Sequence, residues 1–307
     1  MLKQRSFKLV GLITTLLLAL MLSACSNGSD DTKSLGKKEI DIPYVASDNS
    51  TVRALVIAEV LEKVGYDVTT IPVQASGPLY ATVSENSDSF HASGIFPSTD
   101  KGYYNKFKDD INVYDTNHFI SDVKVGLAVP KYVEDINSIS DLKDKEFGDS
   151  VDWKIQGTDA RNGVMKLTKK ELDSDDLKRY SLEEASDQTQ FEAVQKAYGE
   201  QENIVFTGMI PSWFHKETDY KLLDDPNRIF GRDSEHIDLV FNKDFKRKHP
   251  AAYTIATRMA DDWNQKDEEE LAKKIFVNNE RPEQVAKDYV EDNDNKVDDW
   301  LEGIERK

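Results

Sequence analysis

The sequence of 307 residues contains one cysteine, Cys25. A disulfide needs two cysteines, so none can form within this chain, and its fold must depend on packing instead of covalent cross-links. The roughly 270 residues that follow the N-terminal segment are enough to bury a large core. This length is typical of two domains or lobes.

The sequence patterns of common hydrolases are also missing. The five histidines are scattered, and neither a His-Glu-x-x-His zinc helix nor a Gly-x-Ser-x-Gly turn occurs. Aspartates gather near the C-terminus, but their loop lacks the glycine and glutamate of a calcium-binding EF-hand. We therefore predict a protein that is not an enzyme and that holds no metal or cofactor.

Positive charge is scarce. The chain has 57 acidic and 40 basic residues, a net charge of −17. Such a chain repels phosphate backbones, so we predict no nucleic-acid partner. It also repels anionic lipid head groups, so an anchor would be needed to hold it at a membrane.

The long apolar run of the sequence lies at its N-terminus. Lys3, Arg5 and Lys8 precede the run at 9–22, and small residues lead directly into Cys25. This order is typical of a secretory signal, and Leu-Ser-Ala-Cys resembles the bacterial lipobox, in which the cysteine is lipidated. The alternative is a membrane-spanning helix followed by a buried cysteine. A span needs ~20 apolar residues, more than this run supplies.

The residues after the cysteine are polar and contain glycine and serine without apolar periodicity. This composition is typical of a flexible tether. We therefore predict a signal peptide over 1–24 and a lipidated Cys25 with its tether over 25–38. The lipid would hold the rest of the chain at the outer face of the cytoplasmic membrane.

An α/β pattern begins directly after the tether. Alternating apolar residues predict a strand over 39–45, a one-sided apolar stripe predicts a helix over 51–64 that ends at Gly65, and a second strand follows over 66–73. Strand–helix–strand order favours a parallel sheet. Ligands bind at the carboxyl ends of such strands, so the loop after the first strand is a candidate site.

The same criteria extend the pattern along the chain. We predict strands over 89–92, 124–130, 203–207 and 237–241, and helices over 77–83, 100–109, 163–172 and 188–198. Residues 249–307 are predicted to be helical, with apolar stripes that face the core.

Seven segments then occur in a fixed order. They are Gly94–Thr99 with Tyr103-Tyr104, Val125–Pro130, Ile139–Leu142, Gly157–Asp159 with Gly163–Met165, Val205–Gly208 with Pro211–Trp213, Tyr220–Pro226 and Pro282–Trp300. In order and spacing they resemble the glycine betaine/proline-betaine binding proteins of ABC importers, the osmoprotectant-binding group. The resemblance runs from about residue 38 to the C-terminus.

This resemblance implies a two-lobed α/β fold of the type II periplasmic-binding-protein kind, with two crossover strands and a ligand cleft between the lobes. Lobe I would consist of 39–125 and 236–307, and lobe II of 126–235. It also implies an extracytoplasmic lipoprotein that captures a small zwitterionic or quaternary ammonium solute. An ABC permease with a separate ATPase would be its partner.

Family members surround a trimethylammonium group with aromatic faces, which attract it by cation–π interaction. Ile95 and Met209 stand where the family has tryptophan, and a further tryptophan is replaced around Ala46-Ser47. Phe96, Trp213 and Tyr80 remain as candidate aromatic walls. Trp213 fits a pocket wall or the core, whereas core packing is favoured for Phe96.

Arg161 is the main new feature of the predicted site. It precedes a helix N-terminus, where a guanidinium would clamp a carboxylate, although a solvated surface arginine is the alternative. Asp159 and Asp48 would face an ammonium group or serve structural roles, Asp48 as a helix N-cap. We therefore predict a small zwitterion, with two alternatives: a non-betaine, amino-acid-like solute, or a sensing or accessory lipoprotein with a diverged pocket.

Overall fold

The first elements of the fold are two parallel strands joined by a buried helix. The computed structural model describes residues 32–231 and 234–305. β1 (Glu39–Val45) pairs with β2 (Asp67–Val73), and α2 (Ser50–Val64) connects them. The observed bounds lie within one residue of those predicted, because the apolar periodicity of this segment changes sharply from strand to helix and back.

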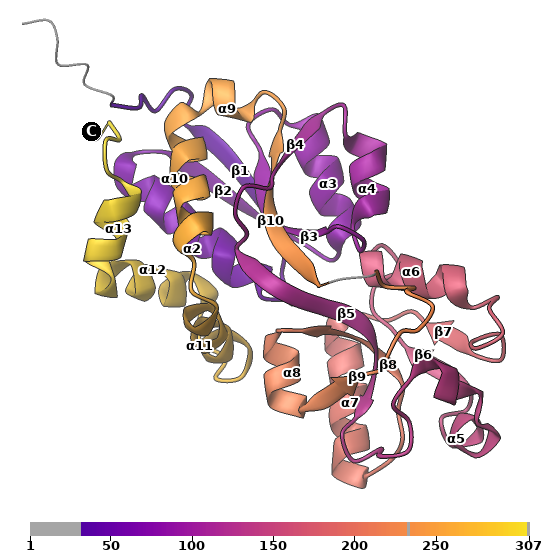
Figure 1. Cartoon of the computed structure of the whole chain (residues 1–307). Helices are drawn as coiled ribbons and strands as arrows, with labels where there is room; N and C mark the ends of the chain where they lie inside the picture. The colour runs from indigo at the N-terminus through magenta and orange to yellow at the C-terminus, as the bar shows by residue number, and fades with distance from the viewer. Residues whose placement is uncertain (1–31, 232–233, 306–307) are drawn as a thin grey trace, which may run out of the picture. The chain divides into compact units, whose positions relative to one another are not determined.

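The main sheet runs through both halves of the molecule (Figure 1). Its strands, in spatial order, are β3 (Phe90–Phe96), β10 (Glu235–Asn242), β5 (Ile120–Pro130), β8 (Phe206–Ile210), β6 (Lys154–Gln156) and β7 (Ser181–Glu183). Two short strands join its sides: β4 (Ile111–Tyr114) pairs with β10, and β9 (Tyr220–Leu222) pairs with β5.

Helices cover the strands in both halves. They are α3 (Ser76–Glu85), α4 (Lys101–Phe107), the 3₁₀ helix η1 (Ile139–Lys143), α5 (Lys145–Ser150), α6 (Gly163–Glu171), α7 (Asp187–Glu200), α8 (Trp213–Thr218), α9 (Phe245–Lys248), α10 (Pro250–Asp262), α11 (Gln265–Phe276), α12 (Pro282–Asp292) and α13 (Asp294–Trp300). The C-terminal helices return to the start of the chain, where α10, α11 and α12 all pack against α2.

Strand β5 belongs to two hydrophobic cores. Ile120 and Val123 pack with α2, β10 and the C-terminal helices, in a part of the molecule that we call lobe I. Leu127 and Val129 pack with residues from the middle of the chain, which form lobe II. The chain thus enters lobe II through β5 and returns to lobe I through β10. The predicted boundaries at 125/126 and 235/236 fall in this transition and stay predictions.

The predicted tether is shorter than expected at its C-terminal end. Leu35 is buried, its carbonyl accepts a hydrogen bond from the Tyr66 hydroxyl at 2.6 Å, and the Lys37 amide donates to the Lys248 carbonyl at 3.0 Å. The chain from Leu35 onward is therefore part of lobe I. The predicted signal peptide (1–24) and Cys25 lie outside the described residues. Within those residues no helix combines the length and apolar character needed to cross a membrane.

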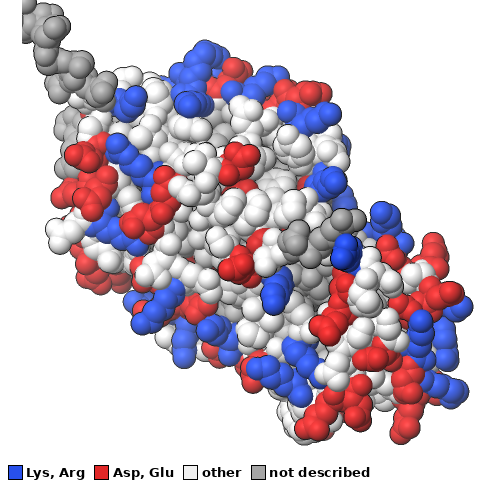
Figure 2. Space-filling view, in the orientation of Figure 1, with Lys and Arg blue, Asp and Glu red and all other residues white. Residues whose placement is uncertain are grey.

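Acidic residues outnumber basic residues in this chain. On the face shown in Figure 2, acidic side chains are interspersed with lysines and arginines over both lobes. On this face the negative charge is therefore not confined to one site. A mixed, charged surface of this kind keeps a protein soluble.

A buried ion pair lies at the centre of lobe I. The Arg53 guanidinium contacts the Glu268 carboxylate at 2.6 Å, with both side chains almost fully buried. Arg53 Nε also donates to the Ala92 carbonyl at 2.7 Å. Glu268 accepts further hydrogen bonds from Asn49 and Trp263. Together these contacts connect α2, β3 and α11.

We expect Arg53→Ala to lower the free energy of unfolding by about 3–5 kcal/mol, because the substitution leaves the Glu268 carboxylate buried without its cation. Lys63→Ala is the matched control on the same helix, since Lys63 forms an exposed pair with Asp294. Exposed pairs contribute at most about 1 kcal/mol. Urea unfolding measures the free energy of unfolding of both variants. Equal small losses in the two variants would contradict a structural role for the buried pair.

Candidate functional site

A small pocket lies between the lobes. Its volume is about 140 Å³, close to the ~150 Å³ of an apolar cavity that takes up benzene. Lobe I contributes the loop after β1 and the end of β3, and lobe II contributes the start of α6, the start of α7 and the end of β8. The pocket therefore suits a solute of only several non-hydrogen atoms.

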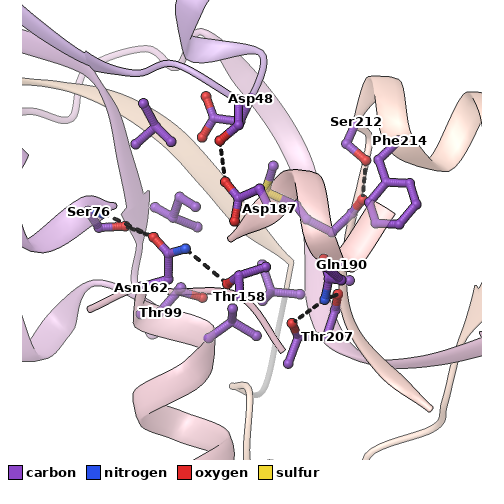
Figure 3. A pocket seen from close by; sticks show the side chains of 18 of the residues that line it. Asp48, Ser76, Thr99, Thr158, Asn162, Asp187, Gln190, Thr207, Ser212 and Phe214 are labelled. Atoms are coloured by element: carbon purple, nitrogen blue, oxygen red, sulfur yellow. Dashed lines mark hydrogen bonds between the residues drawn. The ribbon is translucent and has the colours of Figure 1, made fainter. Parts of the chain in front are cut away.

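Two carboxylates line one part of this pocket. Asp48 comes from the loop after β1 and Asp187 from the first turn of α7, and Figure 3 shows them close together. Asp187 accepts a hydrogen bond from the Ser47 hydroxyl, and Asp48 accepts one from the Ser50 amide at 2.6 Å. The N-cap of α2 is Asn49, so Asp48 lies one residue before the N-cap position that was predicted as its structural alternative.

Burial raises the pKa of both carboxyl groups. Desolvation is the largest cause in each, and it raises the pKa of Asp187 to about 6, with the charges of Asp48 and Asp159 adding to the effect. The Ser47 hydrogen bond opposes this shift. At neutral pH Asp187 is thus mostly ionised, in a place where water does not solvate it well.

Hydrogen-bond donors line another part of the pocket. Thr99, Thr158 and Asn162 contribute polar side chains there, beside the first residues of α6, Gly163 and Val164. The first amides of a helix have no partner within the helix. A helix N-terminus also attracts negative charge through its dipole. This end of the pocket can therefore hold an anionic or carbonyl group.

Trp213 joins the two lobes beside the pocket. Its backbone amide donates to Asn49 Oδ1 at 3.1 Å, and its indole N–H donates to the Ser47 carbonyl at 3.0 Å. The ring stacks on Phe276 of α11 with centroids 4.9 Å apart. Since Ser47, Asn49 and Phe276 belong to lobe I and Trp213 to lobe II, this side of the cleft is closed.

A second set of contacts closes the other side. The Ser76 amide donates to Asn162 Oδ1 at 3.1 Å, and the Gly77 amide donates to the Arg161 carbonyl at 3.2 Å. A Cβ on Gly77 would lie 2.8 Å from the Tyr103 hydroxyl. It would also lie 3.3 Å from Arg161 Cβ of lobe II, so a side chain at this position would be crowded from both lobes.

Four of the residues predicted for the site line the pocket: Asp48, Ile95, Met209 and Trp213. Ile95 and Met209 lie on strands β3 and β8, which extend further than the sequence indicated. Ser47 lines the pocket as well. The three positions where the resemblance leads us to expect tryptophan thus face the pocket with Ser, Ile and Met.

Tyr80 and Phe96 do not line the pocket. The prediction of Tyr80 as an aromatic wall is corrected, whereas Phe96 takes the core position that was favoured for it. Tyr80 is fully buried, its hydroxyl donates to Asp100 at 3.2 Å, and its ring stacks on Tyr103. Phe96 packs edge-on against Tyr104 in the core of lobe I. Both rings contribute to packing.

The predicted carboxylate clamp is likewise corrected. The Arg161 side chain is exposed and forms two hydrogen bonds with Asp159, at 2.8 and 2.6 Å, outside the pocket. These bonds lower the pKa of Asp159. Each charge thus satisfies the other, and neither faces the solute. The backbone carbonyl of Arg161 connects the lobes, because it accepts hydrogen bonds from the Gly77 amide and the Tyr103 hydroxyl of lobe I.

Several pocket residues were missed by sequence reasoning, Asp187 and Thr99 above all. Gln190 supports the floor, where its Nε2 donates to the carbonyl and hydroxyl of Thr207 at 3.0 and 2.9 Å (Figure 3). Aspartate is common in the first turn of a helix that follows a strand, so the sequence around Asp187 does not by itself indicate a binding site. The rule that ligands bind at the carboxyl ends of strands would have included it.

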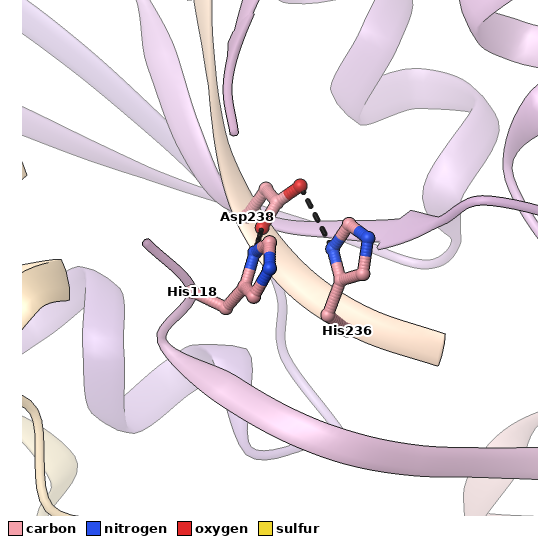
Figure 4. Close-up of side chains that lie close together, drawn as sticks. All are labelled: His118, His236 and Asp238. Atoms are coloured by element: carbon pink, nitrogen blue, oxygen red, sulfur yellow. Dashed lines mark hydrogen bonds and ion pairs between the residues drawn. The ribbon is translucent and has the colours of Figure 1, made fainter. Parts of the chain in front are cut away.

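A separate cluster brings together His118, His236 and Asp238 (Figure 4). Asp238 is fully buried, and its carboxylate lies 2.6 Å from His118 Nδ1 and 3.0 Å from His236 Nδ1. The imidazole rings are stacked, with centroids 3.8 Å apart and planes 22° apart. Lone pairs of nearly parallel rings do not converge on one point. This arrangement suits hydrogen bonding to the carboxylate better than binding of a metal ion.

A small pocket between two α/β lobes that are connected through β5 and β10 is the arrangement of a type II periplasmic binding protein. The chain matches the family described as the substrate binding domain of ABC-type glycine betaine transport system, over residues 38–292. It belongs to this family, whose members are binding proteins of transporters and not enzymes. The predicted family and fold class are confirmed.

Individual relatives support this assignment. The chain is 30% identical over 167 residues to the glycine betaine/carnitine transport binding protein GbuC of Listeria monocytogenes, and it spans about half the length of this curated relative (53%). The structure is similar to lactococcal OpuAC in its closed-liganded conformation complexed with glycine betaine (29% identity, TM-score 0.76, 87% of this chain and 100% of that one). It is also similar to ProX of Borrelia burgdorferi, a glycine betaine/L-proline-binding protein (27%, 0.78, 86% and 96%).

We expect Asp187→Asn to stabilise the ligand-free protein at pH 7 but not at pH 4. Folding raises the pKa of Asp187 to about 6, so the folded state favours the protonated form. Stability from this group is therefore full below the unfolded pKa of about 4 and is lost as pH rises through 6. At pH 7 the substitution should raise the free energy of unfolding by at most about 3 kcal/mol. Urea unfolding at both pH values tests this, and a gain that is equal at the two would contradict it.

Proposed function

We propose that this chain is the extracytoplasmic solute-binding lipoprotein of an ABC importer for a small, ammonium-bearing osmoprotectant of the glycine betaine type. The observation that carries the proposal is the composition of the interlobe pocket. Carboxylates line one part, and hydroxyls with the first amides of α6 line another. A zwitterion has the complementary pair of charges.

Capture follows from the connection between the lobes. The lobes are continuous through β5 and β10 and touch on both sides of the pocket through Trp213 and Gly77. A solute that contacts both lobes binds the closed form more tightly than the open one and shifts the equilibrium toward closure. The closed form would then deliver the solute to a membrane permease, which a separate ATPase drives.

A non-betaine solute is the second candidate. Ser47, Ile95 and Met209 put hydrogen-bonding and apolar side chains at three positions where tryptophan is expected, although Phe191, Trp213, Phe214 and Tyr220 still line the pocket. Fewer ring faces at these positions would weaken cation–π attraction for a trimethylammonium group, which suits an amino-acid-like compound. A sensing or accessory lipoprotein with a diverged pocket would use the same capture step without transport.

We expect at least one solute from a defined panel to stabilise the purified protein. The panel consists of glycine betaine, proline betaine, carnitine, choline, dimethylglycine and the common amino acids. At 100 times its dissociation constant a solute stabilises the folded state by about 2.7 kcal/mol, which a thermal-shift measurement detects. If no ammonium-bearing compound raises the melting temperature, the proposed function is wrong.

Membrane attachment rests on Cys25. We expect the protein to sediment with membranes in cells, and Cys25→Ala to release most of it, because the cysteine would carry the lipid. Ser26→Ala is the control and should leave the protein in the membrane fraction. Equal sedimentation of all three proteins would show that the anchor does not depend on the cysteine.

A further inference from the structure

We propose that the captured solute carries at least one N–H on its cationic nitrogen, and that Asp187 accepts the hydrogen bond from it. The solute class is thus a primary, secondary or tertiary ammonium compound and not a quaternary one. This inference rests on the proposed function, because it concerns the same pocket.

The first observation is an unpartnered oxygen. Asp187 uses Oδ2 to accept the hydrogen bond from Ser47, whereas its Oδ1 is buried and has no partner. A buried carboxylate oxygen without a donor is costly. A ligand N–H in the pocket would supply the missing donor.

The second observation is charge balance. Among the described residues that line the pocket there are two aspartates and no lysine, arginine or histidine. Asp187 lies in the first turn of α7, where the helix dipole favours its ionised form. Negative charge in the pocket therefore lacks a protein counter-charge, and a cationic ligand would provide it.

The third observation concerns the aromatic faces. Four aromatic residues line the pocket: Phe191, Trp213, Phe214 and Tyr220. These rings pack against one another or against the core: one face of Trp213 is covered by Phe276 in a stack with planes 18° apart, Phe191 meets Trp213 edge-on at 4.8 Å, and Phe214 meets Tyr220 edge-on at 5.7 Å. Ile95 and Met209 offer no ring. Cation–π attraction is the main means of holding a quaternary ammonium, which has no hydrogen to donate. The pocket is thus better equipped for hydrogen bonding than for an aromatic cage.

Thr99 fixes the orientation of the solute. It is 6% exposed, its hydroxyl has no partner, and it lines the pocket beside the start of α6. A carboxylate of the solute would accept a hydrogen bond from this hydroxyl and from the first helical amides. The ammonium group then extends toward Asp187.

A methylation series tests the inference directly. Glycine, sarcosine, dimethylglycine and glycine betaine share one carboxylate and differ by single methyl groups, and only glycine betaine lacks an N–H. We expect isothermal calorimetry to show dimethylglycine or a less methylated member binding at least about 10-fold more tightly than glycine betaine, because a charge-assisted hydrogen bond is lost at the last methylation.

Substitution of Asp187, the proposed hydrogen-bond acceptor, is the second test. We expect Asp187→Asn to weaken binding of the N–H compounds by about 10-fold or more and to change betaine binding by less than about threefold. Glu192→Gln is the matched control. It removes one carboxylate from an exposed position on the same helix, outside the pocket, and should leave the whole series unchanged.

The outcomes separate the two proposals. If glycine betaine binds as tightly as dimethylglycine or more tightly, the N–H inference is wrong and the proposed function stands. If the preference for N–H compounds persists in a folded Asp187→Asn protein, the assignment to Asp187 is wrong. If no member of the series and no other ammonium compound binds, both are wrong. Should the variant fail to fold, the wild-type series alone still decides the ligand class.

Discussion

The buried pair of Arg53 and Glu268 determines how lobe I presents its binding surface. Asn49 Nδ2 donates a hydrogen bond to Glu268, and Asn49 Oδ1 accepts one from the backbone amide of Trp213 in lobe II. The core of lobe I is thereby connected to the closed cleft through one short chain of polar contacts. Removing a charge from this chain would disturb the cleft as well as the core, because each group depends on its neighbour for a partner.

The pocket contains a polar group whose burial is energetically unfavourable. Packing alone would favour an apolar interior, yet Asp187 is held against a small cavity with an unsatisfied oxygen. Such groups are retained where a ligand completes them. The same reasoning explains Thr99. Thr99 belongs to lobe I and Asp187 to lobe II, so a solute that contacts both would connect the lobes.

The sequence allowed the general architecture and the first three elements to be predicted, because β1, α2 and β2 have strong and different apolar periods. It located Ile95 and Met209 but placed them in loops, since the strand ends carry no breaker before Pro97 and Pro211. Arg161 was misplaced because its partner, Asp159, lies only two residues away, and a local pair of this kind leaves no trace in periodicity. Asp187 was missed because its importance arises from residues of the other lobe.

The pairing of β5 limits how the lobes can move. Val123 is opposite Glu235 of β10, whereas the next residue, Lys124, is opposite Ile210 of β8. No unpaired residue of β5 therefore separates its pairing with lobe I from its pairing with lobe II. Asp122, directly before, has a left-handed backbone (φ 56°), and the pairing with β10 changes register beside it. The connection through β5 therefore contains no loop, because one strand passes directly from the pairing of lobe I to the pairing of lobe II. A relative movement of the lobes would have to be taken up, on this side, by backbone torsions around Asp122 and not by a flexible linker.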